Sequence, residues 1–337
     1  MGQGALTSRA KGALVGVALG DALGMPAQTL TREQIFARYG RISDFVEPYP
    51  DHPVSHGLLA AQITDDTEQT LLLAEQLVRG QGVVAAGPWA QALLAWEADV
   101  KRRGSRDLLG PSSKAALEAL MAGVPAAETG RTGSTNGAAM RIVPVGIATP
   151  PDLDLILMRV AAACQVTHAT GEAIAAAAAV AMVVSQGIAG MSFESSLPMA
   201  LQAAYAGNRL GAAVGEQDMA GRISLALKIA AASDEAELAR QIGTSVASRA
   251  SVAAAFGVVL LAKGDPWTAA LIAANIGDDT DTIGAIATGM AGACAGLDAF
   301  PRDRVEQVIR VNRLDLDPVV AGLLALRAAT SAERVAS

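Results

Sequence analysis

The stretch NIGDDTDTIGAIATGMAG, residues 275–292, places three aspartates directly before a long run of small and apolar residues. Residues 282–297 carry no charged side chain and include Gly284, Gly289 and Gly292. Small residues allow neighbouring helices to approach one another closely. We therefore expect this segment to form a helix at the centre of the molecule, with its acidic N-terminus at the bottom of a cleft.

The composition of the whole chain predicts the same class of fold. The 337 residues are 51% hydrophobic but only 3% aromatic, and alanine, the best helix former, supplies much of the hydrophobic share. Runs in which β-branched or aromatic residues alternate with polar ones are rare. We predict an all-α fold, a single compact multi-helix orthogonal bundle. No stretch resembles a linker, so residues 1–337 are expected to form one domain with a core of about residues 10–315, although single cores usually stop growing near 250–300 residues.

Helical segments separated by short breakers are expected along most of the chain. Two irregular regions interrupt them: residues 40–62, which contain three prolines, and the glycine-rich residues 123–137. Long loops in a compact helical domain are often functional. The predicted helices cover about residues 8–22, 31–38, 66–79, 87–102, 112–121, 137–147, 152–164, 170–187, 194–205, 220–231, 235–242, 249–262, 267–273, 281–295 and 302–310.

Charge and cysteine content exclude several classes of function. The net charge is −7, which argues against a broad surface for nucleic acid. Cys164 and Cys294 lie far apart in apolar segments without the spacing of zinc ligands, so a reducing cytoplasm is the expected location. The uncharged residues 173–193 are expected to form a buried core helix rather than a membrane span, and the short apolar run in residues 8–20 resembles a signal peptide only weakly. The oligomeric state is left open.

A second acidic turn occurs in ITDDTEQTLLLAEQLV, residues 63–78, so the triplet Asp-Asp-Thr occurs twice, each time before an apolar helix. One copy has a simple structural explanation, because Asp and Thr are favoured at helix N-caps and suit the helix dipole. The second copy is harder to explain in this way. Asp278, Asp279 and Asp281 repel one another unless they are protonated or neutralised by a cation.

If the two acidic turns face each other, they offer a set of oxygen ligands. Such a set suits Mg²⁺ or Mn²⁺ rather than zinc, which prefers nitrogen and sulfur. Several carboxylates together can hold two ions about 4 Å apart. Helix capping and metal coordination both stay open at this point, and the residues concerned are Thr64, Asp65, Asp66, Asp279, Asp281 and Thr282.

The chain also resembles a known family. From about residue 10 to residue 300, five motifs occur in the order and approximate spacing of the ADP-ribosylglycohydrolases, and the paired acidic motifs are specific to that family. The motifs are VGVALGDALGMP (15–26), ITDDTEQT (63–70), GSTNGAAMR (133–141), THAT (167–170) and GDDTDTIGAIATGMAGA (277–293).

This resemblance implies an all-α fold with a binuclear Mg²⁺ or Mn²⁺ centre in a central cleft. Family members bind ADP-ribose with the distal ribose near the two ions and cleave the bond between its anomeric carbon and a side chain, or a related glycosidic bond. Metal ions hold the vicinal diol and lower the pKa of a bound water, and Asp66 or Asp279 would guide that water as the catalytic residue. By motif, one ion would take Thr64, Asp65, Asp66 and Asp281, and the other would take Asp279, Asp281 and Thr282.

Further residues are candidates for substrate binding. The backbone N–H groups and Asn136 of the loop at residues 133–137 would cradle phosphate. Arg141 would meet a phosphate, or else form a salt bridge to an acidic turn. His168 would line the cleft near ribose or phosphate, or else serve as a cap or core contact. The complete predicted substrate-binding set is Gln28, Ser134, Asn136, Gly137, Arg141, His168, Gly277 and Asp278.

Two positions depart from the family pattern. Gln28 stands where many members carry a glutamate beside the scissile bond, and a glutamine cannot exchange a proton, although it can hydrogen-bond a ribose hydroxyl. Gly277 is followed by Asp278 where members often have two glycines, and this extra carboxylate would repel a phosphate or serve as a base. Both changes bear on the substrate rather than on the metal ligands.

Three functions follow from these observations. The first is a Mg²⁺- or Mn²⁺-dependent hydrolase of an N- or O-glycosidic bond to ribose, with ADP-ribose attached to arginine or another side chain as substrate. The second is a hydrolase of a smaller ribosyl compound such as a nucleoside, which Gln28 and Asp278 favour. The third is a non-catalytic ADP-ribose binder or structural relative, and the presence of all six oxygen ligands argues against it.

Overall fold

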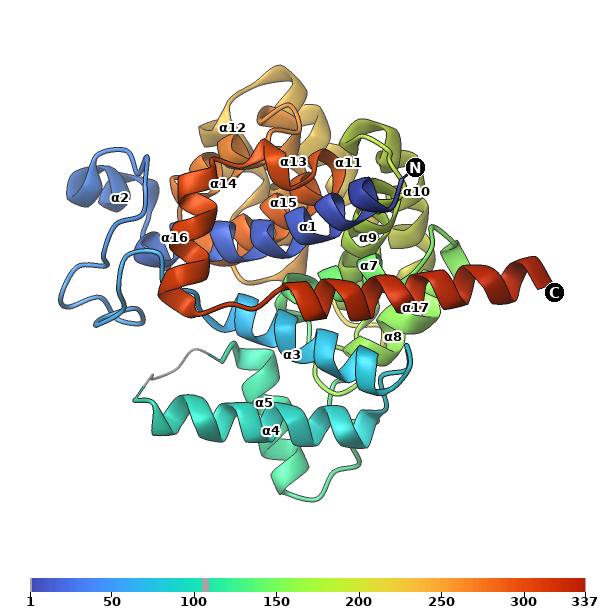
Figure 1. Ribbon diagram of the computed structural model, residues 1–337. Helices are drawn as coiled ribbons and strands as arrows, with labels where there is room; N and C mark the ends of the chain where they lie inside the picture. Colours follow the sequence, from blue (N-terminus) through green and yellow to red (C-terminus); the bar gives the residue numbers. More distant parts are fainter. Residues whose placement is uncertain (1, 105–108, 337) are drawn as a thin grey trace.

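The computed structural model describes residues 2–104 and 109–336, with side chains to residue 332. Within these residues all regular elements are helical, apart from three isolated β-bridges, so the predicted all-α class is confirmed. The acidic segment at residues 275–292 leads into α15 (Thr280–Ala295), in which Thr280 to Cys294 are all buried. The predicted central helix is therefore confirmed (Figure 1).

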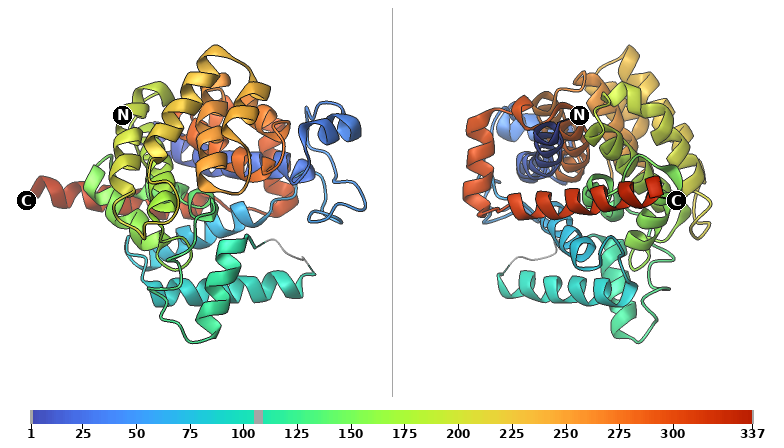
Figure 2. Two further views of the ribbon diagram at one scale, coloured as in Figure 1. Left: turned by 180° about the vertical axis from the view of Figure 1, so that it is seen from behind. Right: turned by 45° about the vertical axis from the view of Figure 1, so that its right-hand side comes forward.

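The remaining helices surround α15 and were largely predicted to within a few residues (Figures 1 and 2). In chain order they are α1 (Gln3–Gly24), η1 (Met25–Ala27), α2 (Arg32–Tyr39), α3 (Asp65–Arg79), α4 (Ala86–Arg102), α5 (Pro111–Met121), α6 (Gly137–Met140), α7 (Val143–Ala148), α8 (Leu153–Cys164), α9 (Gly171–Ile188), α10 (Phe193–Gly207), α11 (Met219–Ala232), α12 (Glu235–Ile242), α13 (Ser248–Leu261), α14 (Pro266–Ala274), η2 (Leu297–Ala299), α16 (Arg302–Asn312) and α17 (Asp317–Ala336).

Glycines bring α1 and α15 into direct backbone contact. Gly12, Gly16, Gly20 and Gly24 recur every fourth residue and so lie on one face of α1. A Cβ atom on any of them would lie closer than 3.0 Å to the backbone of α15. This close packing places the end of α1 beside the N-terminus of α15.

Helix α9 packs against α15 as a second core helix. It is long and apolar enough to cross a membrane, but 94% of its residues are buried inside the protein, as expected for a core helix. Its alanine-rich sequence permits close approach on every side. Figure 2 shows that α4 and α5 lie together on one side of the molecule, where α3 contacts α4.

Two helix predictions were wrong. The predicted helix at 137–147 is divided into α6 and α7, because Pro144 has no N–H to donate within a helix and so begins a new one. Helix α17 was not predicted at all, although Val320, Leu323 and Arg327 recur at helical spacing and are all buried. The two predicted loops, residues 40–62 and 123–137, are confirmed. Neither contains a helix before α6 begins at Gly137.

Candidate active site

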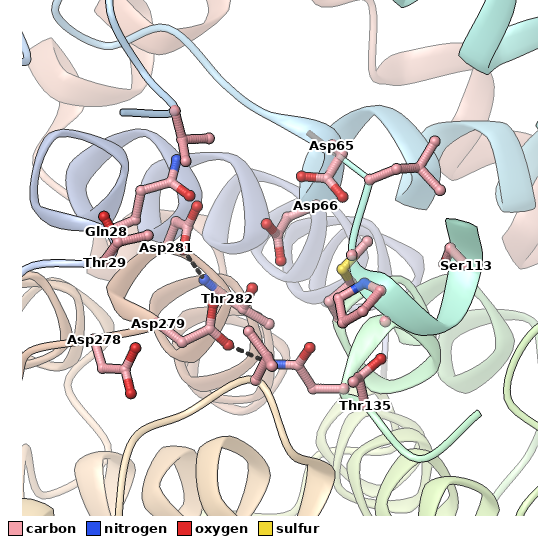
Figure 3. A pocket seen from close by; sticks show the side chains of 18 residues that line it. Gln28, Thr29, Asp65, Asp66, Ser113, Thr135, Asp278, Asp279, Asp281 and Thr282 are labelled. Atoms are coloured by element: carbon pink, nitrogen blue, oxygen red, sulfur yellow. Dashed lines mark hydrogen bonds between the residues drawn. The ribbon is translucent and has the colours of Figure 1, made fainter. Parts of the chain in front are cut away.

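The two acidic turns lie at the N-termini of α3 and α15. Asp65 and Asp66 occupy the first turn of α3, and Asp281 occupies the first turn of α15, whose N-cap is Asp279. Each carboxylate is thus close to the positive end of a helix dipole. These four side chains and Thr282 line one cavity of about 210 Å³. Figure 3 shows the α3 aspartates and the α15 aspartates on facing sides of it.

Burial dominates the electrostatics of this cavity. Asp66, Asp279 and Asp281 are each less than a tenth exposed. Burial, and then the neighbouring carboxylates Asp65 and Asp281, raise the pKa of Asp66 well above its ordinary value. Burial likewise raises the pKa of Asp279 to about 7, although Asn136 donates a hydrogen bond to it. These groups are therefore in need of protons or cations at neutral pH.

One buried carboxylate oxygen has no partner. Oδ1 of Asp66 is buried without a hydrogen bond, and Oδ2 accepts only a 3.3 Å bond from the Thr64 hydroxyl. A buried carboxylate in this state is costly unless another group supplies a proton or a positive charge. Among the residues that the structure describes, no three Asp, Glu, His or Cys side chains are already arranged around a single point as ion ligands.

Asp21 was missed by the sequence analysis. It is fully buried near the end of α1 and accepts hydrogen bonds from the backbone N–H and the hydroxyl of both Thr64 and Thr67. Asp21 therefore caps the N-terminus of α3 from another helix, while the Thr64 side chain makes no cap of its own. Burial raises the pKa of Asp21 to about 6 despite these bonds. A signal was present, because Asp21 is the only charged residue between positions 12 and 24.

The structure places part of the predicted substrate-binding set on the cavity wall. Gln28, Asn136, Gly137 and Asp278 line the cavity, with Asp278 at its exposed rim. Gln28 lies across the cavity from Thr135 in Figure 3, and its Nε2 donates to the Ser55 hydroxyl at 2.8 Å. Thr29, Val54, Leu109, Gly110, Pro111, Ser113, Thr135, Met140 and Val246 complete the wall and were not predicted.

The other predicted residues do not line the cavity. Arg141 and His168 are fully buried behind its wall, where Arg141 donates to Gln69 and Thr167, and lies 5.1 Å from the centre of the Trp89 ring. Ser134 and Gly277 are also absent from the lining. Thr64, predicted as a metal ligand, lies behind the wall, and its hydroxyl is 2.7 Å from Asp21 Oδ1 and 3.3 Å from Asp66 Oδ2.

The backbone around Asp278 joins the cavity rim to the segment after α1. Asp278 and Leu30 form an isolated antiparallel bridge, and the Thr29 N–H donates to the Asp278 carbonyl at 2.7 Å. Gly277 has a φ of 94° and Asp278 a φ of 62°, left-handed conformations that glycine and, less readily, aspartate adopt. These bonds place Gln28 beside the second acidic turn.

The fold and cavity define a class of protein: an all-α chain whose polar site is built from two acidic helix N-termini. The chain belongs to the ADP-ribosylglycohydrolase family, whose model matches residues 3–333. Members of this family are glycohydrolases that act on ADP-ribosylated substrates.

Individual relatives match most of the chain. The uncharacterized protein YegU of Escherichia coli (strain K12) is 34% identical over 327 residues, which cover 95% of this chain and 98% of that protein. The ADP-ribosylarginine hydrolase Tri1 of Pseudomonas putida (strain GB-1) is 28% identical and covers 89% of this chain and 74% of its own. A solved structure titled ADP-ribosylglycohydrolase-related protein complex superimposes with a TM-score of 0.66 at 25% identity, covering 95% of this chain and 97% of that one.

Proposed function

We propose that this protein is a hydrolase that depends on two Mg²⁺ or Mn²⁺ ions and releases ADP-ribose from arginine or another side chain. The observation that carries the proposal is that two acidic helix N-termini, far apart in the chain, line one cavity with buried aspartates. The similarity to an ADP-ribosylarginine hydrolase supports the choice of substrate.

The donor set fits two divalent cations. The unpartnered oxygen of Asp66 and the raised pKa values of the buried aspartates mark a place that favours positive charge. Carboxylate and hydroxyl oxygens are the ligands that Mg²⁺ and Mn²⁺ prefer. When bound, the ions would lower the pKa of a coordinated water and hold the ribose diol. The residues of the cavity wall that would hold them are Asp65, Asp66 and Asp281 for one ion, and Asp279, Asp281 and Thr282 for the other. Thr64 lies behind the wall and would support the first ion through its contact with Asp66.

The remaining steps belong to the residues of the chain. Asp66 or Asp279 accepts a proton from the attacking water, whose oxygen joins the anomeric carbon as the glycosidic bond breaks. The leaving nitrogen keeps the bonding electrons and takes up the proton. Asn136 orients Asp279 by donating to one of its oxygens, and it also donates to the Ser251 hydroxyl at 2.8 Å. Gln28 contacts a ribose hydroxyl and transfers no proton.

A smaller ribosyl substrate is the second candidate. The cavity volume of about 210 Å³ lies below the roughly 300–1,000 Å³ of most small-molecule sites. A nucleoside fits such a volume more easily than the whole of ADP-ribose. The carboxylate of Asp278 at the rim also disfavours a phosphate there.

The direct test is a comparison of substrates. The purified protein is incubated with Mg²⁺, with Mn²⁺ or with EDTA, and with ADP-ribosyl-arginine, O-acetyl-ADP-ribose or a panel of nucleosides. We expect free ADP-ribose from ADP-ribosyl-arginine, and only when metal is present. Release of ribose from nucleosides alone would establish the second candidate. Thermal stabilisation by ADP-ribose without turnover would identify a binder that has no activity.

The stability of the metal-free protein is expected to fall as the pH rises from 5 to 8. The pKa values of Asp21 and Asp279 are raised to about 6 and about 7, so the folded protein holds protons that the unfolded chain releases above pH 4. Stability is therefore greatest at low pH and is lost as these groups ionise. The check is the thermal unfolding midpoint, measured in EDTA at several pH values.

Adding Mg²⁺ or Mn²⁺ should reverse this loss, because the cations compete with protons for the same oxygens. At 100 times its Kd a ligand stabilises the folded state by about 2.7 kcal/mol. We expect a stabilisation of that order at pH 8 and little at pH 5. An equal effect at both pH values would show that the ions bind elsewhere.

A further inference from the structure

A continuous chain of hydrogen bonds, buried at its centre and partly buried at its ends, runs behind the cavity wall and reaches the cavity at both ends. It begins at Asp65, whose Oδ2 accepts a 3.2 Å bond from Gln69 Nε2. The Gln69 Oε1 accepts from Arg141 at 2.6 Å. Arg141 also donates to the Thr167 hydroxyl. His168 continues the chain, with Nδ1 2.7 Å from the Thr167 hydroxyl and Nε2 3.0 Å from the Thr135 hydroxyl.

The direction of every bond in this chain follows from Arg141. A guanidinium group only donates, so the Thr167 oxygen accepts from it. The Thr167 hydroxyl is fully buried, and among the described residues His168 Nδ1 is the only acceptor within hydrogen-bond distance of it, so its proton is donated to Nδ1. A neutral imidazole carries one proton, which must therefore be on Nε2 and be donated to Thr135. The Thr135 oxygen accepts this bond, so its own proton points elsewhere, and Thr135 lines the cavity.

His168 is held in the neutral state that this direction of the hydrogen bonds requires. It is fully buried, and burial together with the nearby charge of Arg141 lowers its pKa well below the ordinary value. Its ring lies against Gly137, where an added Cβ would come within 2.8 Å of the imidazole. This contact explains why the residue after Asn136 is a glycine.

We propose that Arg141, acting through Thr167 and His168, sets the Thr135 hydroxyl as a hydrogen-bond donor to a substrate oxygen that carries no proton. The class of ligand atom is a phosphate or ring oxygen, and this part rests on the proposed function. The other end of this chain of hydrogen bonds also directs a donor toward the cavity, because Gln69 donates to Asp65 there. Arg141 and His168 are thus positioning residues, and Thr135 makes the contact with substrate.

The substrate oxygen is expected on the side of the cavity where the uncharged Thr135 and Ser113 lie. Thr135 and Ser113 lie on the side away from Gln28 and Asp278 in Figure 3. A donor placed apart from the carboxylates gives an anionic or ether oxygen a partner without repulsion. The predicted roles of Arg141 and His168 in substrate binding are accordingly reassigned to holding Thr135.

The first test reads the tautomer of His168 without any substrate. Nitrogen-15 NMR of the whole protein is expected to show the proton of His168 on Nε2, with His52 and His56 assigned by substitution. In Thr167→Val, which is isosteric and lies outside the cavity, the preference for that tautomer should be lost. A proton on Nδ1 in the unsubstituted protein, or a doubly protonated ring at pH 7, would overturn the proposal.

The second test measures binding with Thr135→Val and Thr135→Ser. In the presence of Mg²⁺ we expect Thr135→Val to weaken ADP-ribose binding roughly tenfold, the worth of about one hydrogen bond. Thr135→Ser keeps the hydroxyl and should bind as the unsubstituted protein does. An equal loss with adenosine identifies a ring oxygen, and a loss with ADP-ribose alone identifies a phosphate oxygen. Unchanged binding of both ligands in Thr135→Val would refute the contact.

The two tests separate this inference from the proposed function. If the unsubstituted protein neither binds nor hydrolyses any ribosyl compound, the proposed function fails. The tautomer of His168 and its response to Thr167→Val still decide whether Arg141 sets the direction of the chain.

Discussion

Replacing Gly20 with alanine is expected to destabilise the protein by more than about 4 kcal/mol, beyond the usual range for one substitution. A Cβ at Gly20 would lie within 3.0 Å of the Gly284 carbonyl and of the Thr288 hydroxyl. If the Cβ overlapped only a flexible side chain, a change of rotamer would relieve the overlap. At Gly20 it overlaps the backbone of Gly284, so relief requires α1 and α15 to separate along their length.

The loss would extend to the site. Asp21 follows Gly20 directly and caps α3, so a displacement of α1 also displaces Asp65 and Asp66. Urea unfolding of the purified protein gives the free energy, and the yield of soluble protein gives an independent sign of the same effect.

Gly4→Ala is the matched control for this change. Gly4 lies in the same helix, is exposed, and has nothing within 4 Å of the position of a new Cβ. Alanine in a helix is more favourable than glycine by up to about 1 kcal/mol, so the control should be neutral or slightly stabilised. If Gly20→Ala unfolded within 1 kcal/mol of the unsubstituted protein, the inferred backbone contact would be incorrect.

Replacing Asp281 with alanine is expected to lower the rate of metal-dependent hydrolysis by roughly 10²–10³-fold, the equivalent of several kcal/mol of lost transition-state stabilisation. Asp281 is 3% exposed, lines the cavity, and is the residue assigned to both ions. Stabilisation by Mg²⁺ or Mn²⁺ should disappear together with the activity.

The stability of Asp281→Ala in EDTA provides a signature of the mechanism. Burial and then repulsion from Asp279 raise the pKa of Asp281 well above its ordinary value. Removing this carboxylate removes an unfavourable charge, so at pH 8 the metal-free variant should be at least as stable as the unsubstituted protein. A variant that merely misfolds would be less stable under every condition.

Asp278→Ala is the matched control, because it removes a carboxylate from the same acidic turn that is not a proposed metal ligand. Asp278 belongs to the same cluster but lies at the exposed rim of the cavity. It should retain the stabilisation by metal and most of the activity. If Asp278→Ala lost metal binding while Asp281→Ala kept it, the assignment of ligands would have to be reversed.

Much of the fold could be predicted because its signals are local. Helices α3 and α15 begin within one residue of their predicted starts, since aspartates before an apolar run are strong N-terminal signals. The break at Pro144 and helix α17 also had local signals, in the ring of a proline and in the spacing of Val320 and Leu323, so those two errors were avoidable.

The site was less predictable because its contacts join distant parts of the chain. Arg141 and His168 are polar residues in motifs shared with the family, and nothing in their local sequence distinguishes the wall of a cavity from the layer behind it. That distinction depends on Trp89 and Gln69, which reach Arg141 from two other helices, and on Thr167, which contacts both residues. Asp21 was recognisable as an isolated charge, but its partners Thr64 and Thr67 are more than 40 residues away.

The sequence by itself determined the all-α class, the family, the position of most helices and the oxygen-only character of the acidic turns, because each depends on residue types at short spacing. Only the tertiary structure decided that Asp21 caps α3, that Thr135 and Gln28 face each other across the cavity, and that Arg141 lies behind its wall. The position of Asp21 follows from backbone contact between α1 and α15, which depends on glycines that meet only after folding. The position of Arg141 follows from its bonds to Gln69 and Thr167, and that of Gln28 from the bridge between Leu30 and Asp278, all of which join residues far apart in the chain.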